Sequence, residues 1–158
     1  MMNSLRSCTA FFALAAAAAA QCAFTTLTPT AIGAGCNPVA GTTTPGLRSA
    51  LAVRACQVEL LAEVLIGRPS DQPIARALVL GTALAPQQLP ALGPGCVLQP
   101  TADVCILQPV FSGPYLVALP NAPLPPLTLY AQAAILYEVA GTNRLFWSVS
   151  EALALALQ

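Results

Sequence analysis

Prolines and glycines interrupt this chain at short intervals, and their spacing restricts the fold more than any other feature. Of the 158 residues, 15 are Pro and 10 are Gly, and all of them lie from residue 29 onwards. Proline ends helices and both residue types mark turns, so their spread argues against a helical bundle, and NAPLPP at 121–126 forbids any helix. We therefore expect an all-β fold: an antiparallel β-sandwich of about seven to eight short strands, after an N-terminal signal helix.

The segments between the turns carry strand patterns. Residues 127–139 form the longest candidate, with apolar residues on one parity from Leu127 to Tyr137. Residues 56–66 alternate in the same way, although the spacing of Glu59 and Glu63 fits a helix equally well. Near the end, strict alternation places one apolar set on a common face: Val149, Leu153, Leu155 and Leu157. The other expected strands are 74–84, 96–99, 104–111 and 115–120.

The first twenty residues predict an exported protein. One Arg precedes the apolar run FFALAAAAAA, which matches the core of a signal peptide and is too short to span a membrane. Small residues at 18–20 favour cleavage before Gln21; the alternative is an uncleaved anchor helix. Cys22 follows Gln, which does not fit lipidation. We expect a signal peptide at 1–20, an irregular N-terminal segment at 21–46 and the β-sandwich domain at 47–158, with no transmembrane segment after cleavage and a secreted location, extracellular or periplasmic.

The charged and reactive side chains exclude several functions. The chain has six Arg, two Asp and four Glu but neither Lys nor His, so its net charge is zero and no basic patch can bind nucleic acid. The usual general bases are missing and no carboxylate lies in a recognisable motif, so we expect no enzyme and no cofactor. Exposed aromatic rings can bind glycans, although rings at strand spacing more often belong to a core. The candidates for ligand contact are Trp147, Tyr115 and Tyr130.

Five cysteines remain after the expected cleavage, and thiols of an exported protein oxidise to disulfides. At least eight residues separate any two of them and His is absent, which excludes a zinc site or a redox pair. The phrases CVLQP and CILQP, at 96–100 and 105–109, therefore contain structural cysteines rather than metal ligands. One alternative joins Cys96 to Cys105 across a hairpin and leaves Cys36 to pair with Cys56. In the other, Cys96 and Cys105 each pair with a cysteine outside residues 96–109.

The order of several motifs resembles a family of small secreted β-sandwich proteins, also found as C-terminal tail modules, in planctomycete-like bacteria. The motifs are GAGC, LVLG, LGPGC at 92–96, LTLYAQAAIL from 127 and SEALAL from 150. The resemblance covers roughly residues 33–157 and implies export, a sandwich fold and a strand at 56–66. The family has no established activity, so the resemblance implies none for this chain.

The resemblance also implies a disulfide pattern. The family keeps two cysteines after glycine, at the places of Cys36 and Cys96, which implies that these two are bonded. Cys56 and Cys105 would then pair between two strands, and Cys22 would stay free or join a second chain as a dimer. We expect a secreted, non-catalytic structural or interaction module of the cell envelope or extracellular space, with an unknown protein or an envelope polymer as partner. The alternative is a glycan- or surface-polymer-binding module, and an enzyme comes third.

Overall fold

The computed structural model describes residues 22–38, 44–64, 71–90, 96–122, 124–139 and 142–158, and the expected signal helix at 1–20 lies outside them. These described residues form ten strands and one short 3₁₀ turn, Val53–Ala55. The strands are β1 (Leu27–Ile32), β2 (Gly46–Ala52), β3 (Gln57–Glu63), β4 (Asp71–Gly81), β5 (Leu84–Gln88), β6 (Val97–Pro100), β7 (Val104–Pro109), β8 (Tyr115–Ala118), β9 (Leu127–Val139) and β10 (Arg144–Leu157).

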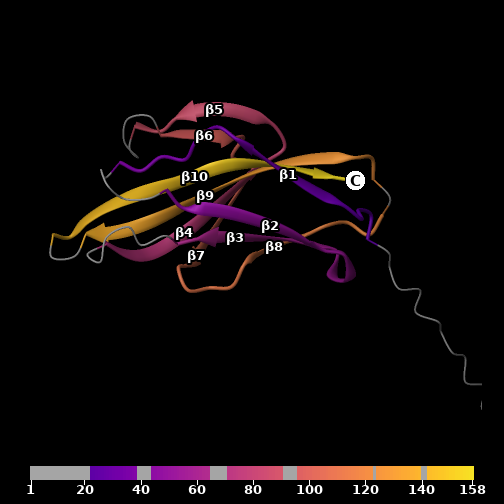
Figure 1. Ribbon diagram of the computed structural model, residues 1–158, viewed down its shortest axis with the longest axis horizontal. Coiled ribbons are helices and arrows are strands. Elements are labelled where there is room, and N and C mark those ends of the chain that lie inside the picture. The colour runs from indigo at the N-terminus through magenta and orange to yellow at the C-terminus, as the bar shows by residue number, and fades with distance from the viewer. Residues whose placement is uncertain (1–21, 39–43, 65–70, 91–95, 123, 140–141) are drawn as a thin grey trace, which may run out of the picture.

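The strands pair antiparallel in three sheets. The large sheet has the order β1-β10-β9-β4-β7, the small sheet has the order β2-β3-β8, and β5 and β6 form a separate hairpin. Figure 1 shows the small sheet on one side of the large sheet and the hairpin on the other side. The expected all-β antiparallel sandwich is therefore confirmed.

Three strands were not expected from the sequence. The segment 21–46 is not irregular throughout, because β1 runs along the edge of the large sheet beside β10. Strand β2 pairs with β3 along its whole length, and β5 includes Pro86 in a stretch beyond the expected strand 74–84. Proline is tolerated in β5 because this short strand has only β6 as a neighbour.

The main core lies between the large and small sheets. Strand β9 buries Ala131, Ala133 and Ile135, the parity expected from its sequence. Val58 and Leu60 of β3 are buried on the facing sheet, while Leu61 between its buried neighbours is exposed. This period of two confirms that residues 57–63 form a strand, since a helix would bury residues three or four apart.

A β-bulge divides β10 into two halves that face opposite ways. The register passes from Val149 opposite Ala134 to Ala152 opposite Gln132, so Ser150 and Glu151 lie opposite the single residue Ala133. The extra residue reverses the parity of the strand. Val149 consequently faces away from the main core, and the expectation that it shares a face with Leu153, Leu155 and Leu157 is wrong for Val149 alone.

Two disulfides stabilise the fold. Cys36 is bonded to Cys96, as the family resemblance implied, with a Cα–Cα distance of 5.2 Å. Cys22 is bonded to Cys56, with a Cα–Cα distance of 5.0 Å, and Cys105 is unpaired and exposed. The expected Cys56–Cys105 bridge and the expected free or dimer-forming Cys22 are therefore both wrong.

The position of Cys105 explains why it cannot reach Cys56. Cys105 lies opposite Val79 on the side of the large sheet that faces away from the small sheet, whereas Cys56 is buried in the main core. The two similar phrases also do not form a hairpin, because β6 pairs with β5 and β7 pairs with β4. Cys96, directly before β6, is bonded to Cys36, whereas Cys105 lies on β7 of the large sheet, so the alternative Cys96–Cys105 bridge is excluded.

Candidate functional site

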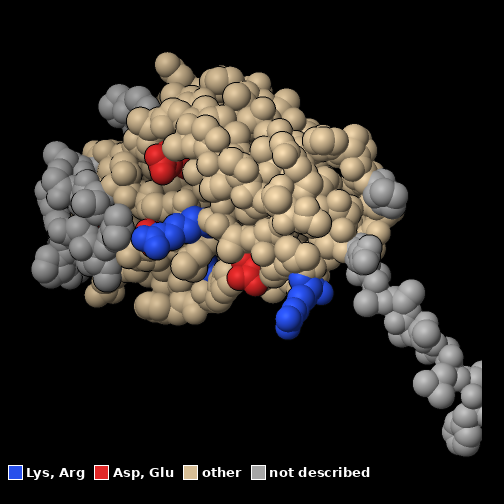
Figure 2. All heavy atoms as spheres, turned by 45° about the vertical axis from the view of Figure 1, so that its right-hand side comes forward, with Lys and Arg blue, Asp and Glu red and all other residues tan. Residues whose placement is uncertain are grey.

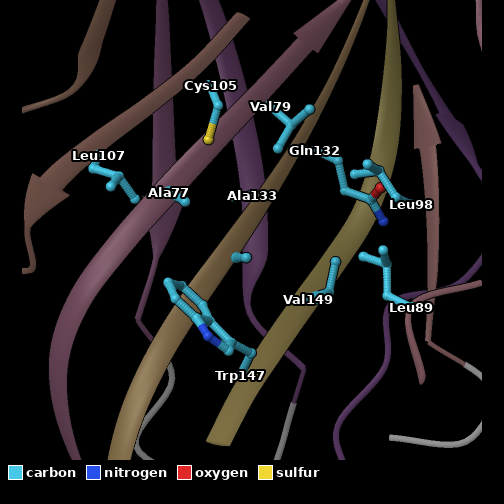
Figure 3. A pocket seen from close by; sticks show the side chains of 11 residues that line it. Ala77, Val79, Leu89, Leu98, Cys105, Leu107, Gln132, Ala133, Trp147 and Val149 are labelled. Atoms are coloured by element: carbon cyan, nitrogen blue, oxygen red, sulfur yellow. The ribbon is translucent and has the colours of Figure 1, made fainter. Parts of the chain in front are cut away.

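An apolar groove lies between the β5–β6 hairpin and the outer face of the large sheet, the face turned away from the main core. Its cavity volume is about 220 Å³. Figure 3 shows the side chains of Trp147 and Val149 on one side of this space, Leu89 and Leu98 on the hairpin side, and Leu107 on the far side. These residues come from β10, the hairpin and β7, so strands distant in sequence build one site.

The groove is hollow because alanines occupy the centre of one row across the sheet. In this row Val149 lies opposite Ala134, Ala134 lies opposite Ala77, and Ala77 lies opposite Leu107. Larger side chains stand at both ends of the row, and two methyl groups form the floor between them. The bulge in β10 is essential to this arrangement, since without the parity reversal Val149 would face the main core.

Gln132 holds the hairpin over the groove. Its Oε1 accepts a hydrogen bond from the backbone N–H of Gln99 at 2.9 Å. Its Nε2 donates to the carbonyl oxygens of Val97 at 3.1 Å and Ser150 at 2.9 Å. Both amide hydrogens are used, so Gln132, the only amide side chain among the described residues that line the groove, offers no free donor to a ligand.

The Cys36–Cys96 disulfide fixes the same hairpin from its other end. The backbone of Cys36 exchanges two hydrogen bonds of 2.8 Å with Val149 on β10, and its partner Cys96 directly precedes β6. At the end of β4, Gly81 leaves room for the returning chain, because a Cβ there would clash with the carbonyl oxygen of Thr101. The hairpin is thus held by the Gln132 amide and by the disulfide, and Gly81 allows its chain to approach β4 closely.

The three aromatic residues expected at a ligand site have different environments. Trp147 is half-buried and lines the groove, so its contact with a ligand stays a prediction that the geometry allows. Tyr130 is half-buried two residues before Gln132 on β9 and is not among the lining residues. Tyr115 is fully buried and belongs to the core.

Tyr115 packs beneath a buried arginine that sequence reasoning did not single out. The guanidinium of Arg76 lies 4.9 Å from the ring centroid of Tyr115. Arg76 Nη2 donates to Gln108 Oε1 at 2.8 Å, to the Ser112 carbonyl oxygen at 2.6 Å and to the Gly113 carbonyl oxygen. Burial raises the pKa of Tyr115 to about 12, although the nearby Arg76 charge acts to lower it. This cluster fixes the turn between β7 and β8 and is structural.

The surface offers little for ionic or metal chemistry. Figure 2 shows a face on which charged side chains occur only as isolated spots. Asp103 accepts hydrogen bonds from Thr82 N–H and Thr82 Oγ1, both at 2.8 Å, and from Thr101 Oγ1, and these bonds hold the pKa of its carboxyl below the usual value. Within the described ranges, no three Cys, Asp or Glu side chains gather where they could hold a metal ion.

A second hollow, of about 310 Å³, lies on the outer face of β2 and β3. It is lined by Arg48, Glu59 and Leu61 among others, and Arg48 forms a salt bridge of 2.6 Å with Glu63 at its side. None of the described residues that line it is aromatic, so it lacks the ring on which a sugar would stack.

Comparisons with known proteins add no relative: no family model, no curated protein sequence and no solved structure matches this chain significantly. Among the residues that the structure describes, no helix is long and apolar enough to cross a membrane. The fold and the site together define a disulfide-bonded antiparallel β-sandwich with an apolar groove on its outer face.

Proposed function

We propose that the protein is a secreted, non-catalytic interaction module of the cell envelope or extracellular space, and that its groove binds an apolar group. The groove is the observation that carries this proposal, because it is lined mainly by aliphatic side chains, with one indole ring, the Cys105 thiol and the amide of Gln132, whose two hydrogens are already bonded. The two intramolecular disulfides are consistent with an oxidising compartment. Export itself rests on the expected signal peptide.

The size of the groove favours the end of an alkyl chain or a single apolar side chain. A dry apolar cavity of about 150 Å³ holds a benzene molecule, whereas drug-sized ligands occupy roughly 300–1,000 Å³. The volume of about 220 Å³ lies between these limits. A glycan fits less well, since sugar hydroxyls need several hydrogen-bond partners beside the aromatic ring, whereas the lining is mostly aliphatic and both amide hydrogens of Gln132 are already used.

Trp147 provides a direct assay because it is the only tryptophan in the chain. Its fluorescence should change in a saturable way when straight-chain alcohols or alkyl glucosides are added. Each methylene that enters the groove contributes about 0.8 kcal/mol, so affinity should rise roughly fourfold per carbon until the groove is full. Glucose oligomers without an alkyl chain should leave the fluorescence unchanged.

Filling the floor of the groove gives the matched control. Ala134→Leu should abolish the response to alkyl chains, because the new side chain occupies the space between Val149 and Ala77. Ala156→Leu, which lies opposite Thr128 on the same sheet and away from the groove, should leave the response intact. A response to oligosaccharides but not to alkyl chains would contradict the proposal and support the glycan-binding alternative.

A further inference from the structure

Strand β7 is an uncovered edge of the large sheet. The order β1-β10-β9-β4-β7 leaves it with β4 on one side and no described strand on the other. Its sequence VCILQP carries no charge, and the chain has no charged residue between Asp103 and Glu138. Natural edge strands are usually protected from pairing by charges, bulges or prolines. Strand β1 at the opposite edge has Pro29 near its middle, whereas the proline of β7 is its last residue.

Exposed apolar side chains accompany this open edge. Val104 is 49% exposed, Leu107 is 70% exposed, and Phe111 in the turn after β7 is 92% exposed. Single exposed apolar residues are normal, but here they gather along one uncharged strand whose backbone groups are also open. An edge of this kind is suited to bind another strand.

The alternation of the β4–β7 ladder identifies the open backbone groups. Antiparallel residue pairs alternate between hydrogen-bonded and non-hydrogen-bonded pairs. Pro109 lies opposite Ala75 and has no N–H to donate, so Pro109 and Ala75 form a non-hydrogen-bonded pair. Counting back from this non-bonded pair, Cys105 and Leu107 also form non-bonded pairs with β4. Their N–H and C=O groups therefore point to the open edge.

We propose that β7 pairs antiparallel with β7 of a second copy of this chain about a twofold axis at Ile106. In this register Cys105 lies opposite Leu107 of the second copy and Leu107 opposite Cys105 of the second copy, which forms four backbone hydrogen bonds. A register shifted toward Asp103 would be poorer, because the N–H of Asp103 already donates to the carbonyl oxygen of Leu80 at 3.1 Å. Asp103 would lie opposite Pro109 of the second copy, so the two carboxylates do not meet.

A second copy fits this edge better than a charged partner does. The strand has no charge with which to select such a partner, and its open donors and acceptors complement themselves in the twofold register. Cys105 and Leu107 also line the apolar groove, so pairing would bring the grooves of the two copies side by side on one continuous sheet.

Sedimentation velocity over a range of concentrations tests the pairing, with a matched pair of substitutions. The unaltered protein should show a concentration-dependent dimer. Leu107→Lys should shift the protein to a monomer, because pairing of the two β7 strands would bring the positively charged ammonium groups of the two copies close together. Leu145→Lys makes the same change at a leucine that is 59% exposed on β10, beyond β4 and β9, and should leave the dimer unchanged. A monomer at all concentrations, or a dimer that survives Leu107→Lys, would overturn the proposal.

Chemical cross-linking tests the register without relying on that variant. In a chain carrying Cys8→Ser, Cys105 is the available thiol, since the other described cysteines are bonded. The proposed register places the two Cys105 Cα atoms about 7–8 Å apart, within reach of a short bismaleimide. A covalent dimer is expected, whereas Leu145→Cys in a chain that also carries Cys8→Ser and Cys105→Ser should give no covalent dimer under the same treatment. No dimer from Cys105, or equal dimer from both positions, would refute the register.

Discussion

Replacing Gln132 with methionine keeps the approximate shape of the side chain but removes every hydrogen bond that its amide makes. The bond to the Ser150 carbonyl oxygen is buried, so the loss leaves that oxygen without this donor at a cost of about 1–3 kcal/mol. The bonds to Gln99 and Val97 are partly buried, and water can replace part of each, so each should cost about 0.5–1 kcal/mol. We expect the free energy of unfolding to fall by about 3 kcal/mol.

Urea unfolding followed by circular dichroism measures this loss, and the fluorescence of Trp147 reports on the groove. The hairpin should loosen in the variant, so Trp147 emission should shift to longer wavelength at urea concentrations well below global unfolding. Gln87→Met on β5 is the matched control, because Gln87 is exposed, and it should change stability by less than about 0.5 kcal/mol. A loss below 1 kcal/mol for Gln132→Met, with unchanged emission, would refute the role assigned to this amide.

Three further outcomes follow from the bonds and environments described above. Non-reducing peptide mapping should recover two linked pairs, Cys22–Cys56 and Cys36–Cys96, and a link from Cys105 to either pair would contradict the fold; each closed loop, of 34 and 60 residues, should contribute on the order of 4 kcal/mol in the chain-entropy model. Because the folded pKa of Tyr115 is raised to about 12, its contribution to stability is complete below pH 10 and should be lost as pH rises toward 12; urea unfolding at a series of alkaline pH values checks this, and a Tyr115→Phe variant should lose less stability over that window. Mass spectrometry of the exported protein should find its N-terminus at or within a few residues of Gln21, and an extracellular form that retains Met1 would contradict export by cleavage.

The parity of the long strands could be predicted from the sequence because burial on one face imposes a period of two. The buried residues Ala131, Ala133 and Ile135 of β9 follow it, as do Val58 and Leu60 of β3. The resemblance to a secreted family supplied the Cys36–Cys96 bond, which periodicity could not, since pairing depends on which strands become neighbours.

The groove could not be predicted because it depends on two features without a local sequence signature. The first is the bulge at Ser150 and Glu151, which turns Val149 to the outer face although its spacing from Leu153 suggests a shared one. The second is the placement of the β5–β6 hairpin, which depends on hydrogen bonds between β6 and the buried amide of Gln132. Gln132 lies on β9, whose sequence pattern predicts only an amphipathic strand. A buried glutamine beside alanines is a signal only when its partners, eighteen or more residues away in the chain, are already known.

The same limit applies to the free thiol. Five cysteines must leave one unpaired, and Cys22 at the start of the domain was the simplest choice for it. The chain instead brings Cys22 to the core beside Cys56 and places Cys105 on the opposite side of the large sheet. Which cysteine stays unpaired depends on the strand order, in which β7 is the neighbour of β4 and not of β6.

Methyl NMR with an alkyl chain that carries a nitroxide would test the apolar groove most directly. With alanine and valine methyl groups labelled, signals of Ala77, Ala134 and Val149 should broaden most strongly, because these methyl groups line the groove. Signals of Val58 and Ala62, which lie in the core on the side of the small sheet, should broaden least. Strongest broadening at Ala50, in the second hollow, or uniform weak broadening throughout, would contradict an apolar binding site between the hairpin and the large sheet.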